Sequence, residues 1–397
     1  MNPSTWMNDT TAIHDLPLRR ICLPTTHDSG TDQLTNPMVG APGLPQPLVI
    51  VYNKLPELAE KFEFLNREKI GEVLAETTLA VMGGIFDGVQ GLATANDSSI
   101  AQQLANGMRG LDLRICQSDG EFYTYHGLRG TLLATVLQDI ASFLQQPGGE
   151  IVYVTVGHYI GFHAGTPTET QLLQQIESAL GAYAYSPAIA SDVFDQTWQQ
   201  IVTLNGTASA ASRVILVNGE SATASAPFWP KSYSPPDSDN TDMAIYGAYT
   251  NTTDLNTMLQ GQIANFNAAK AGNLPFALYM TLTPSGDDYT DVIVNDVGEA
   301  LVDLGGDLQS RGMLIYRVMG DVLVAIGNKL QINYPLRSGF STLEVLASEV
   351  NEQLDSYVQQ YFAPAPGQPN QVSMIYLDWY ETTNVVELAI ALSCSGT

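Results

Sequence analysis

Short apolar runs rich in β-branched residues alternate along the chain with longer segments whose apolar residues recur every three to four positions. The apolar runs predict buried strands, and the longer segments predict amphipathic helices. Because strands alternate with helices many times, the pattern favours a parallel sheet closed into a single β/α barrel over an open sheet. The expected strands are 20–24, 110–116, 121–125, 151–156, 213–217, 243–246, 275–282 and 373–377, and the expected helices are 132–145, 168–181, 253–271, 294–309 and 341–361.

Two stretches interrupt this alternation. The first, about 32–95, separates the first two strands; it begins with Pro/Gly-rich coil and continues with a helical pattern at 55–86. We interpret it as an insertion on the barrel rim, with its helix packed on the barrel or, less favoured, serving as a lid or lipid-touching element. The second, about 219–242, contains Pro235-Pro236-Asp237 and is predicted to be a long loop. With these insertions, the 397 residues fit one single-domain barrel.

The charge balance narrows the possible partners. Sixteen Lys and Arg residues against 41 Asp and Glu residues give a net charge of −25 at pH 7. This field repels the phosphates of nucleic acid, and it opposes anionic lipid surfaces, so we expect no nucleic-acid partner and at most transient contact with a membrane surface. Residues 1–10 show no signal-peptide pattern, and no run in the N-terminal third approaches the length of a membrane span. The composition favours a soluble, extracellular protein, and we expect a monomer.

The chain has only five histidines, so their placement is informative. His27 follows an apolar run in Leu23-Pro-Thr-Thr-His-Asp-Ser-Gly-Thr31, and His126 ends another in Phe122-Tyr-Thr-Tyr-His-Gly127. In a β/α barrel, the C-terminal ends of the strands carry the active site. A single histidine at a strand end is more often structural than catalytic, but two of them, with Asp28 beside the first, predict an acid–base pair.

A third motif, Arg109-Gly-Leu-Asp-Leu-Arg114, lies between the two histidines. On a strand, Asp112 and Arg114 point to the same face. Burying such charges is costly unless they are paired or used. Either the two residues form a salt bridge in the barrel wall, or Arg114 binds a phosphate through its planar guanidinium while Asp112 orients it.

In order and chemistry, these three motifs resemble the X domain of phosphatidylinositol-specific phospholipase C and its bacterial and fungal relatives. Later segments at 151–156, 243–249, 277–286 and 375–379 are similar more weakly, so the resemblance spans most of the chain outside the two insertions. It implies a distorted TIM-type (β/α)8 barrel that cleaves a phosphodiester.

The resemblance also implies a role for each motif residue. His27 would be the general base that deprotonates the attacking hydroxyl, and His126 the general acid that protonates the leaving alkoxide. Asp28 would support His126, Asp378 would orient His27, and Arg114 would stabilise charge on the phosphoryl oxygens. Phosphoryl transfer needs this combination of positioning, charge stabilisation and proton transfer near neutral pH.

The sequence departs from the bacterial inositol enzymes at their sugar contacts. Gly247 stands where they carry an aspartate, although Tyr249 two residues later is kept. Asn218 replaces an arginine, and Gly157-His158-Tyr159 replaces a lysine. Asp112, Tyr249, Asn218 and His158 are therefore candidate substrate contacts, with His158 either a contact or a structural residue. The loss of three contacts predicts altered recognition of inositol.

We predict that the protein is a phosphoric diester hydrolase or lyase of the phospholipase C type, acting on a phospholipid or a soluble diester. Calcium-dependent members gather carboxylates around the phosphate, whereas Arg114 supplies a fixed positive charge there, so we expect no metal and no other cofactor. Two alternatives stay open. One is a metal-dependent glycerophosphodiester or sphingomyelin phosphodiesterase, and the other is a catalytically idle protein that binds a headgroup.

Overall fold

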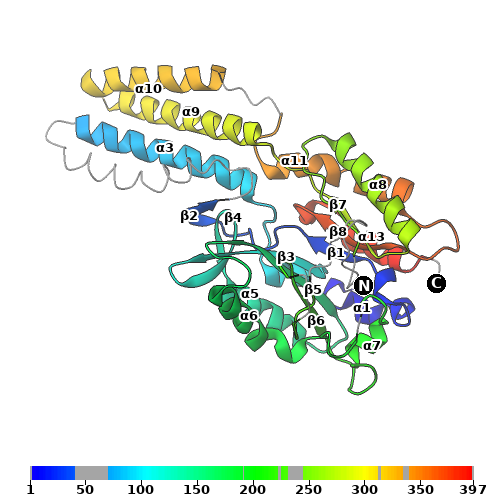
Figure 1. Cartoon of the computed structure of the whole chain (residues 1–397). Coiled ribbons are helices and arrows are strands. Elements are labelled where there is room, and N and C mark those ends of the chain that lie inside the picture. The colour runs from blue at the N-terminus through cyan, green and yellow to red at the C-terminus, as the bar shows by residue number, and fades with distance from the viewer. Residues whose placement is uncertain are drawn as a thin grey trace.

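Six parallel strands form a curled sheet in the order β6-β5-β3-β1-β8-β7, wrapped by helices (Figure 1). The computed structural model describes residues 2–40, 70–190, 192–221, 225–230, 245–311, 314–333 and 339–395. The strands are β1 (Leu23–Thr26), β2 (Thr35–Gly40), β3 (Gly110–Ser118), β4 (Glu121–Leu132), β5 (Ile151–Ile160), β6 (Arg213–Asn218), β7 (Phe276–Met280) and β8 (Val372–Leu377). The helices are α1 (Trp6–Asp9), α3 (Ile70–Ala93), α4 (Ile100–Ala105), α5 (Leu133–Leu144), α6 (Pro167–Leu180), α7 (Trp198–Val202), α8 (Leu255–Gly272), α9 (Gly286–Ser310), α10 (Leu314–Asn333), α11 (Leu343–Asn351), α12 (Leu354–Tyr357) and α13 (Val385–Ser393).

The strands are apolar on both faces because helices cover the outside of the sheet and the barrel interior is packed. On β5, Tyr153 points inward and packs with residues of β6 and β8, whereas Val152 and Val154 point outward toward α5 and α6. Inside, the rings of Tyr279 and Tyr376 stack with centroids 4.5 Å apart. This curled, helix-covered sheet confirms the distorted barrel fold predicted from the alternating pattern.

The curled sheet stops short of complete closure in the part of the chain that the structure describes. Trp229 extends one edge through a parallel bridge to Val217, and Tyr246 extends the other through a bridge to Phe276. No described residues pair these two edges with each other. Most of the expected loop 219–242, and the first half of the expected strand 243–246, lie outside the described residues.

The strand that carries His126 differs from the expectation. β4 is antiparallel to β3, with Ile115 opposite Thr124 and Ser118 opposite Glu121, so it is the second arm of a hairpin and not a barrel strand. The turn between them has positive φ at Asp119 and Gly120, which favours a tight hairpin. His126 also lies inside β4, which continues to Leu132, and not at its end.

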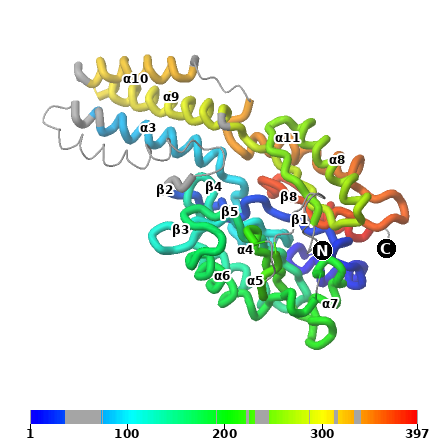
Figure 2. The backbone as a smooth tube through the Cα atoms, in the orientation of Figure 1, coloured from blue at the N-terminus to red at the C-terminus, as the bar shows by residue number. Residues whose placement is uncertain are grey.

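Three long helices, α3, α9 and α10, lie side by side and extend away from the barrel as an arm (Figures 1 and 2). The helix expected at 55–86 is α3, which ends at Ala93; residues 41–69 lie outside the described residues. α3 packs along α9, and only its C-terminal end meets the barrel near β4 and α11, so the arrangement differs from the helix on the barrel that we favoured. α10 was not predicted.

Glycines let the arm helices pack with their backbones in close contact. A Cβ atom on Gly305 would lie 2.7 Å from the carbonyl oxygen of Gly320, and one on Gly327 would lie 2.4 Å from the carbonyl oxygen of Gly298. A Cβ atom on Gly84 of α3 would lie 2.6 Å from the Cα atom of Val297. Among the described helices, none is long and apolar enough to cross a membrane.

Candidate active site

A cavity of about 830 Å³ opens at the C-terminal ends of the parallel strands. His27, Asp28 and Asp378 line it from the ends of β1 and β8, Asp112 and Arg114 from β3, and His126 from β4. The structure therefore brings together residues from three distant parts of the sequence. The remaining lining residues are Thr155, Gly157, His158, Gly219, Glu220, Gly247, Tyr249, Asn251, Thr252, Thr253, Tyr279, Leu282, Thr283, Pro284, Ser285, Tyr289 and Leu343.

Buried hydrogen bonds fix the segment that carries His27 and Asp28. The backbone N–H of His27 donates to the carbonyl of Leu377 (2.9 Å), so the segment continues the pairing of β1 with β8. The amide of Asn96, which follows α3, donates to the carbonyl of His27 (2.7 Å). Asp28 has a φ of 47°, in the left-handed region, which turns the chain sharply after β1.

Asp378 holds the His27 ring from the end of β8. Nδ1 of His27 lies 2.9 Å from Oδ1 of Asp378, both side chains being buried. A carboxylate only accepts, so this bond places a hydrogen on Nδ1 and leaves Nε2 as the atom that can take a proton. Asn351 of α11 donates to the carbonyls of Asp378 and Trp379, both at 3.0 Å, and so fixes the turn that carries the carboxylate.

Asp28 lies at the centre of the charged groups. Its Oδ2 atom is 3.5 Å from Nδ1 of His27 and also 3.5 Å from Nε2 of His126, and its Oδ1 atom pairs with Nε of Arg114. The Asp28 side chain has no exposed surface. Burial alone would raise its pKa, but Arg114 and then His27 outweigh this and hold the pKa well below its usual range.

His126 is oriented by the end of the arm. Its Nδ1 atom lies 2.8 Å from the carbonyl oxygen of Ala93, the last residue of α3. A carbonyl only accepts, so Nδ1 carries the hydrogen and Nε2 faces Asp28. Burial lowers the pKa of His126 below its ordinary value, and Asp28 offsets only part of that effect.

The two histidines thus differ in their resting charge. Burial by itself would lower the pKa of His27 as well, but the carboxylates of Asp28 and Asp378 together raise it to about 9. At neutral pH the proton is therefore held on His27, while His126 is neutral. Environments that shift the pKa values of two titratable groups in opposite directions are typical of acid–base sites.

Arg114 contacts His27 and Asp28 in the segment after β1 and not Asp112, its neighbour on β3. Besides its pair with Asp28, its Nη2 atom lies 3.1 Å from Nε2 of His27. Among the described residues no ion pair joins Arg114 to Asp112, so the salt bridge within the barrel wall is not formed. Asp28 and Asp112 raise the pKa of Arg114 above its ordinary value although burial opposes them. The guanidinium is fixed in place and permanently charged.

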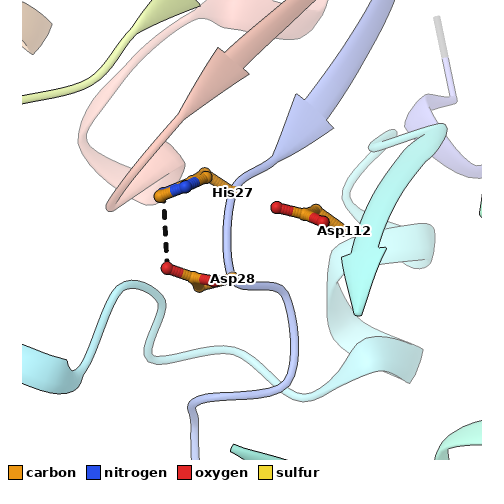
Figure 3. A group of neighbouring side chains, drawn as sticks. All are labelled: His27, Asp28 and Asp112. Carbon is orange, nitrogen blue, oxygen red and sulfur yellow. Dashed lines mark ion pairs between the residues drawn. The ribbon is translucent and has the colours of Figure 1, made fainter. Parts of the chain in front are cut away.

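His27, Asp28 and Asp112 are close enough to be considered as metal ligands. One ligand atom from each lies within 4.8 Å of the others, and Figure 3 shows the Asp112 carboxylate facing the loop that carries His27 and Asp28. However, Asp28 and His27 are both contacted by the Arg114 guanidinium. A cation bound between these ligands would be repelled by that fixed positive charge, so the donor set fits a divalent metal poorly.

The candidate substrate contacts are placed differently from one another. Tyr249 lines the cavity, with its ring stacked 5.5 Å from that of His27 and its hydroxyl bonded to Thr283. His158 also lines the cavity, in a left-handed conformation with φ of 53°. Asn218 does not reach it: its amide bonds to Glu169 (3.1 Å) on α6, and its side-chain oxygen accepts from the backbone N–H of Glu220 (3.0 Å).

Several residues that shape the site were not identified from the sequence. Glu220 enters the cavity from the loop after β6, and its Oε1 atom accepts from the backbone N–H of His158 (2.7 Å). The backbone carbonyl of Ala93 accepts from His126. The side-chain amides of Asn96 and Asn351 donate to the backbone carbonyls of His27 and Asp378. The Asn218-Gly-Glu220 sequence directly after an apolar run was the available signal for Glu220, because strand ends line the mouth of a barrel.

Comparison with known proteins identifies the fold of this chain. No family model matches the sequence, and no curated protein matches it. A structure of phosphatidylinositol-specific phospholipase C from S. aureus, from work on its membrane binding, aligns with 99% of this chain and 98% of its own at a TM-score of 0.53 and 12% identity. A pentafluoro-Phe variant of the Staphylococcus aureus enzyme aligns over 99% and 98% at a TM-score of 0.53 and 13% identity. The enzyme from Listeria monocytogenes aligns over 99% of both chains at 12% identity, with a TM-score of 0.47. As the motifs suggested, this chain has the fold of bacterial phosphatidylinositol-specific phospholipase C.

Proposed function

We propose that this protein is a metal-independent phosphodiesterase of the phospholipase C type, which cleaves a phospholipid or a related soluble diester. The observation that carries the proposal is the position of Asp28, whose Oδ2 atom is 3.5 Å from one nitrogen of each histidine. One carboxylate can therefore stabilise a proton on either ring. The fold shared with bacterial phospholipases C supports the same reaction class.

His27 is the general base and His126 the general acid in this proposal. A hydroxyl on the substrate, or water, attacks phosphorus and gives its proton to Nε2 of His27, while Asp378 stabilises the resulting imidazolium. The phosphorus–oxygen bond to the leaving group breaks, and Nε2 of His126 donates the proton that neutralises the alkoxide. Attack by a neighbouring hydroxyl gives a cyclic phosphodiester, which water opens by the reverse use of the two rings.

This assignment requires the reactive proton to lie on His126, although at rest it is held on His27. When the two Nε2 atoms together carry one proton, that proton can lie on either ring, and Asp28 contacts both rings. Arg114 contributes to both forms. Its contact with Nε2 of His27 is a hydrogen bond only while that nitrogen is unprotonated, so proton transfer to His27 releases Nη2 toward a phosphoryl oxygen.

The metal-free part of the proposal is supported by the guanidinium on Asp28. Transfer of a phosphoryl group needs positive charge near its equatorial oxygens, and Arg114 supplies it from the cavity wall.

The test is a panel of phospholipid vesicles and a soluble aryl phosphodiester, assayed for released headgroup or phenolate with and without chelator. We expect turnover that is unaffected by the chelator. Binding of these diesters without turnover would contradict the proposal and identify a headgroup-binding protein. Activity that disappears in chelator and returns with added calcium would identify a metal-dependent enzyme.

A further inference from the structure

The cavity has a second polar region beside Arg114, built on β3, β5 and the end of β6. Asp112 and Thr155 are register partners on adjacent parallel strands, and both line the cavity. Glu220 approaches from the β6 side: a Cβ atom on Gly157 would lie 3.2 Å from its Oε1 atom. The missing side chain at Gly157 therefore makes room for this carboxylate next to the strand positions of Thr155 and Arg114.

These groups have hydrogen-bonding capacity that the protein does not use. The Oγ1 atom of Thr155 is buried without a hydrogen-bond partner, and the residue is 6% exposed. Oε1 of Glu220 accepts from His158, which leaves Oε2 for a ligand. No Lys or Arg among the described residues forms an ion pair with Asp112 or Glu220. An unpaired buried hydroxyl on a residue of a cavity wall is costly unless a ligand or water satisfies it.

The charge of the cavity indicates what this region binds. Four carboxylates line it (Asp28, Asp112, Glu220 and Asp378), against the Arg114 guanidinium and the His27 imidazolium. A phosphodiester adds another negative charge to this excess. A substrate whose headgroup carries a positive charge compensates it, whereas a neutral polyol does not.

We propose that Asp112, Thr155 and Glu220 form a subsite for a primary ammonium group on the headgroup of the substrate, an inference that rests on the proposed phosphodiesterase function. A primary ammonium has three N–H donors, and the two carboxylates and the Thr155 hydroxyl supply three acceptors. A quaternary ammonium has no N–H group and is recognised by aromatic faces; the aromatic rings Tyr249 and Tyr279 line the cavity but are not part of this subsite.

The test uses p-nitrophenyl phosphodiesters that share a leaving group and differ only in the second alcohol: 2-aminoethyl, 2-(trimethylammonio)ethyl and propyl. We expect kcat/KM for the aminoethyl ester to exceed that for the propyl ester about tenfold or more, since charged hydrogen bonds contribute at least that factor. The trimethylammonio ester should fall well below the aminoethyl ester. Glu220→Gln, Asp112→Asn and Thr155→Val should each lower the aminoethyl-to-propyl ratio.

Glu177→Gln, an exposed carboxylate change on α6, is the matched control and should keep the wild-type ratio. Hydrolysis of all three esters at similar efficiency would overturn the subsite and leave the proposed function standing. A preference that disappears in chelator would also overturn it, because a bound metal would then explain the carboxylates. If no ester is hydrolysed, the vesicle panel still decides the proposed function, and calorimetry with O-phosphoethanolamine against propyl phosphate decides the subsite alone: equal affinities would reject it.

Discussion

Nδ1 of His126 donates to the carbonyl oxygen of Ala93 over 2.8 Å, so the C-terminal end of an arm helix orients one of the two histidines that contact Asp28. The carbonyls at the end of a helix lack intrahelical partners and carry its negative partial charge. The bond satisfies one of these carbonyls and fixes the tautomer in which Nε2 faces Asp28. The arm is thereby part of the architecture of the candidate site.

The pH dependence of activity should follow the two histidine pKa values. Below the lowered pKa of His126, both rings are protonated and no base is present; above about 9, where His27 loses its proton, both are neutral and no acid is present. We therefore expect a bell-shaped profile of kcat/KM with its alkaline limb near pH 9, measured with a soluble diester. A rate that keeps rising above pH 10 would contradict the shared-proton mechanism.

Variants of the two histidines should separate the base from the acid. His27→Ala and His126→Ala should each lower kcat about 10²-fold or more on an alkyl diester, because acid–base catalysis typically supplies that much. On an aryl diester, whose leaving group needs no proton, His126→Ala should lose far less activity and His27→Ala the same. Circular dichroism checks that both variants fold. Rescue of His27→Ala by the aryl substrate would reverse the roles.

Arg114→Lys should reduce activity much more than stability. A lysine keeps a charge near Asp28, but it cannot contact Asp28, His27 and a phosphoryl oxygen through a planar fork. We expect kcat to fall at least about tenfold while the urea midpoint changes little. Arg317→Lys on exposed α10 is the control. Wild-type kcat in Arg114→Lys would show that the guanidinium only balances charge.

Phosphatidylinositol should not be the preferred substrate. Gly247 carries no carboxylate, and a Cβ atom there would lie 2.9 Å from the carbonyl oxygen of Ala277, so the wall does not admit one without a shift. Asn218 is bonded to Glu169 behind the cavity and is not available to inositol hydroxyls. A competition assay with mixed-lipid vesicles measures the preference. Strong selectivity for phosphatidylinositol would show that other residues bind the inositol ring.

Two neighbouring glycines on α9 test whether the arm helices pack as closely as described. Gly305→Ala places a methyl group 2.7 Å from the carbonyl of Gly320 and should destabilise the fold by about 1–3 kcal/mol. Gly306→Ala meets nothing within 4 Å and should stabilise it by about 0.5–1 kcal/mol through helix propensity. Urea denaturation of both variants gives the comparison, and equal effects would mean that the helices do not pack as described.

The site residues that the sequence predicted are those that can be recognised from their immediate neighbours in the chain. His27, Asp28 and Arg114 lie on or just after strands, so their apolar flanks and the period of two placed them correctly at the mouth. His126 reaches the same cavity from a hairpin strand, which an apolar run alone does not distinguish from a barrel strand.

Other features depend on contacts between residues that are far apart in the chain. Asn218 points away from the cavity because Glu169, 49 positions earlier, binds its amide. α10 contains Gly320 and Gly327, which weaken its helical signal, and it is stabilised by packing on α9, which the sequence pattern does not show.

The spacing of the glycine contacts would allow the arm to change in length without moving the residues at the cavity. Gly298 and Gly305 are seven residues apart on α9, and their partners Gly327 and Gly320 are seven apart on α10. Removing one seven-residue unit from each helix would bring one contact into the place of the other and shorten the arm by about 10 Å. With a matching change in α3, Ala93 and the start of α9 at the cavity would stay where they are. The length of the arm can therefore change by whole heptads without moving the residues that line the cavity.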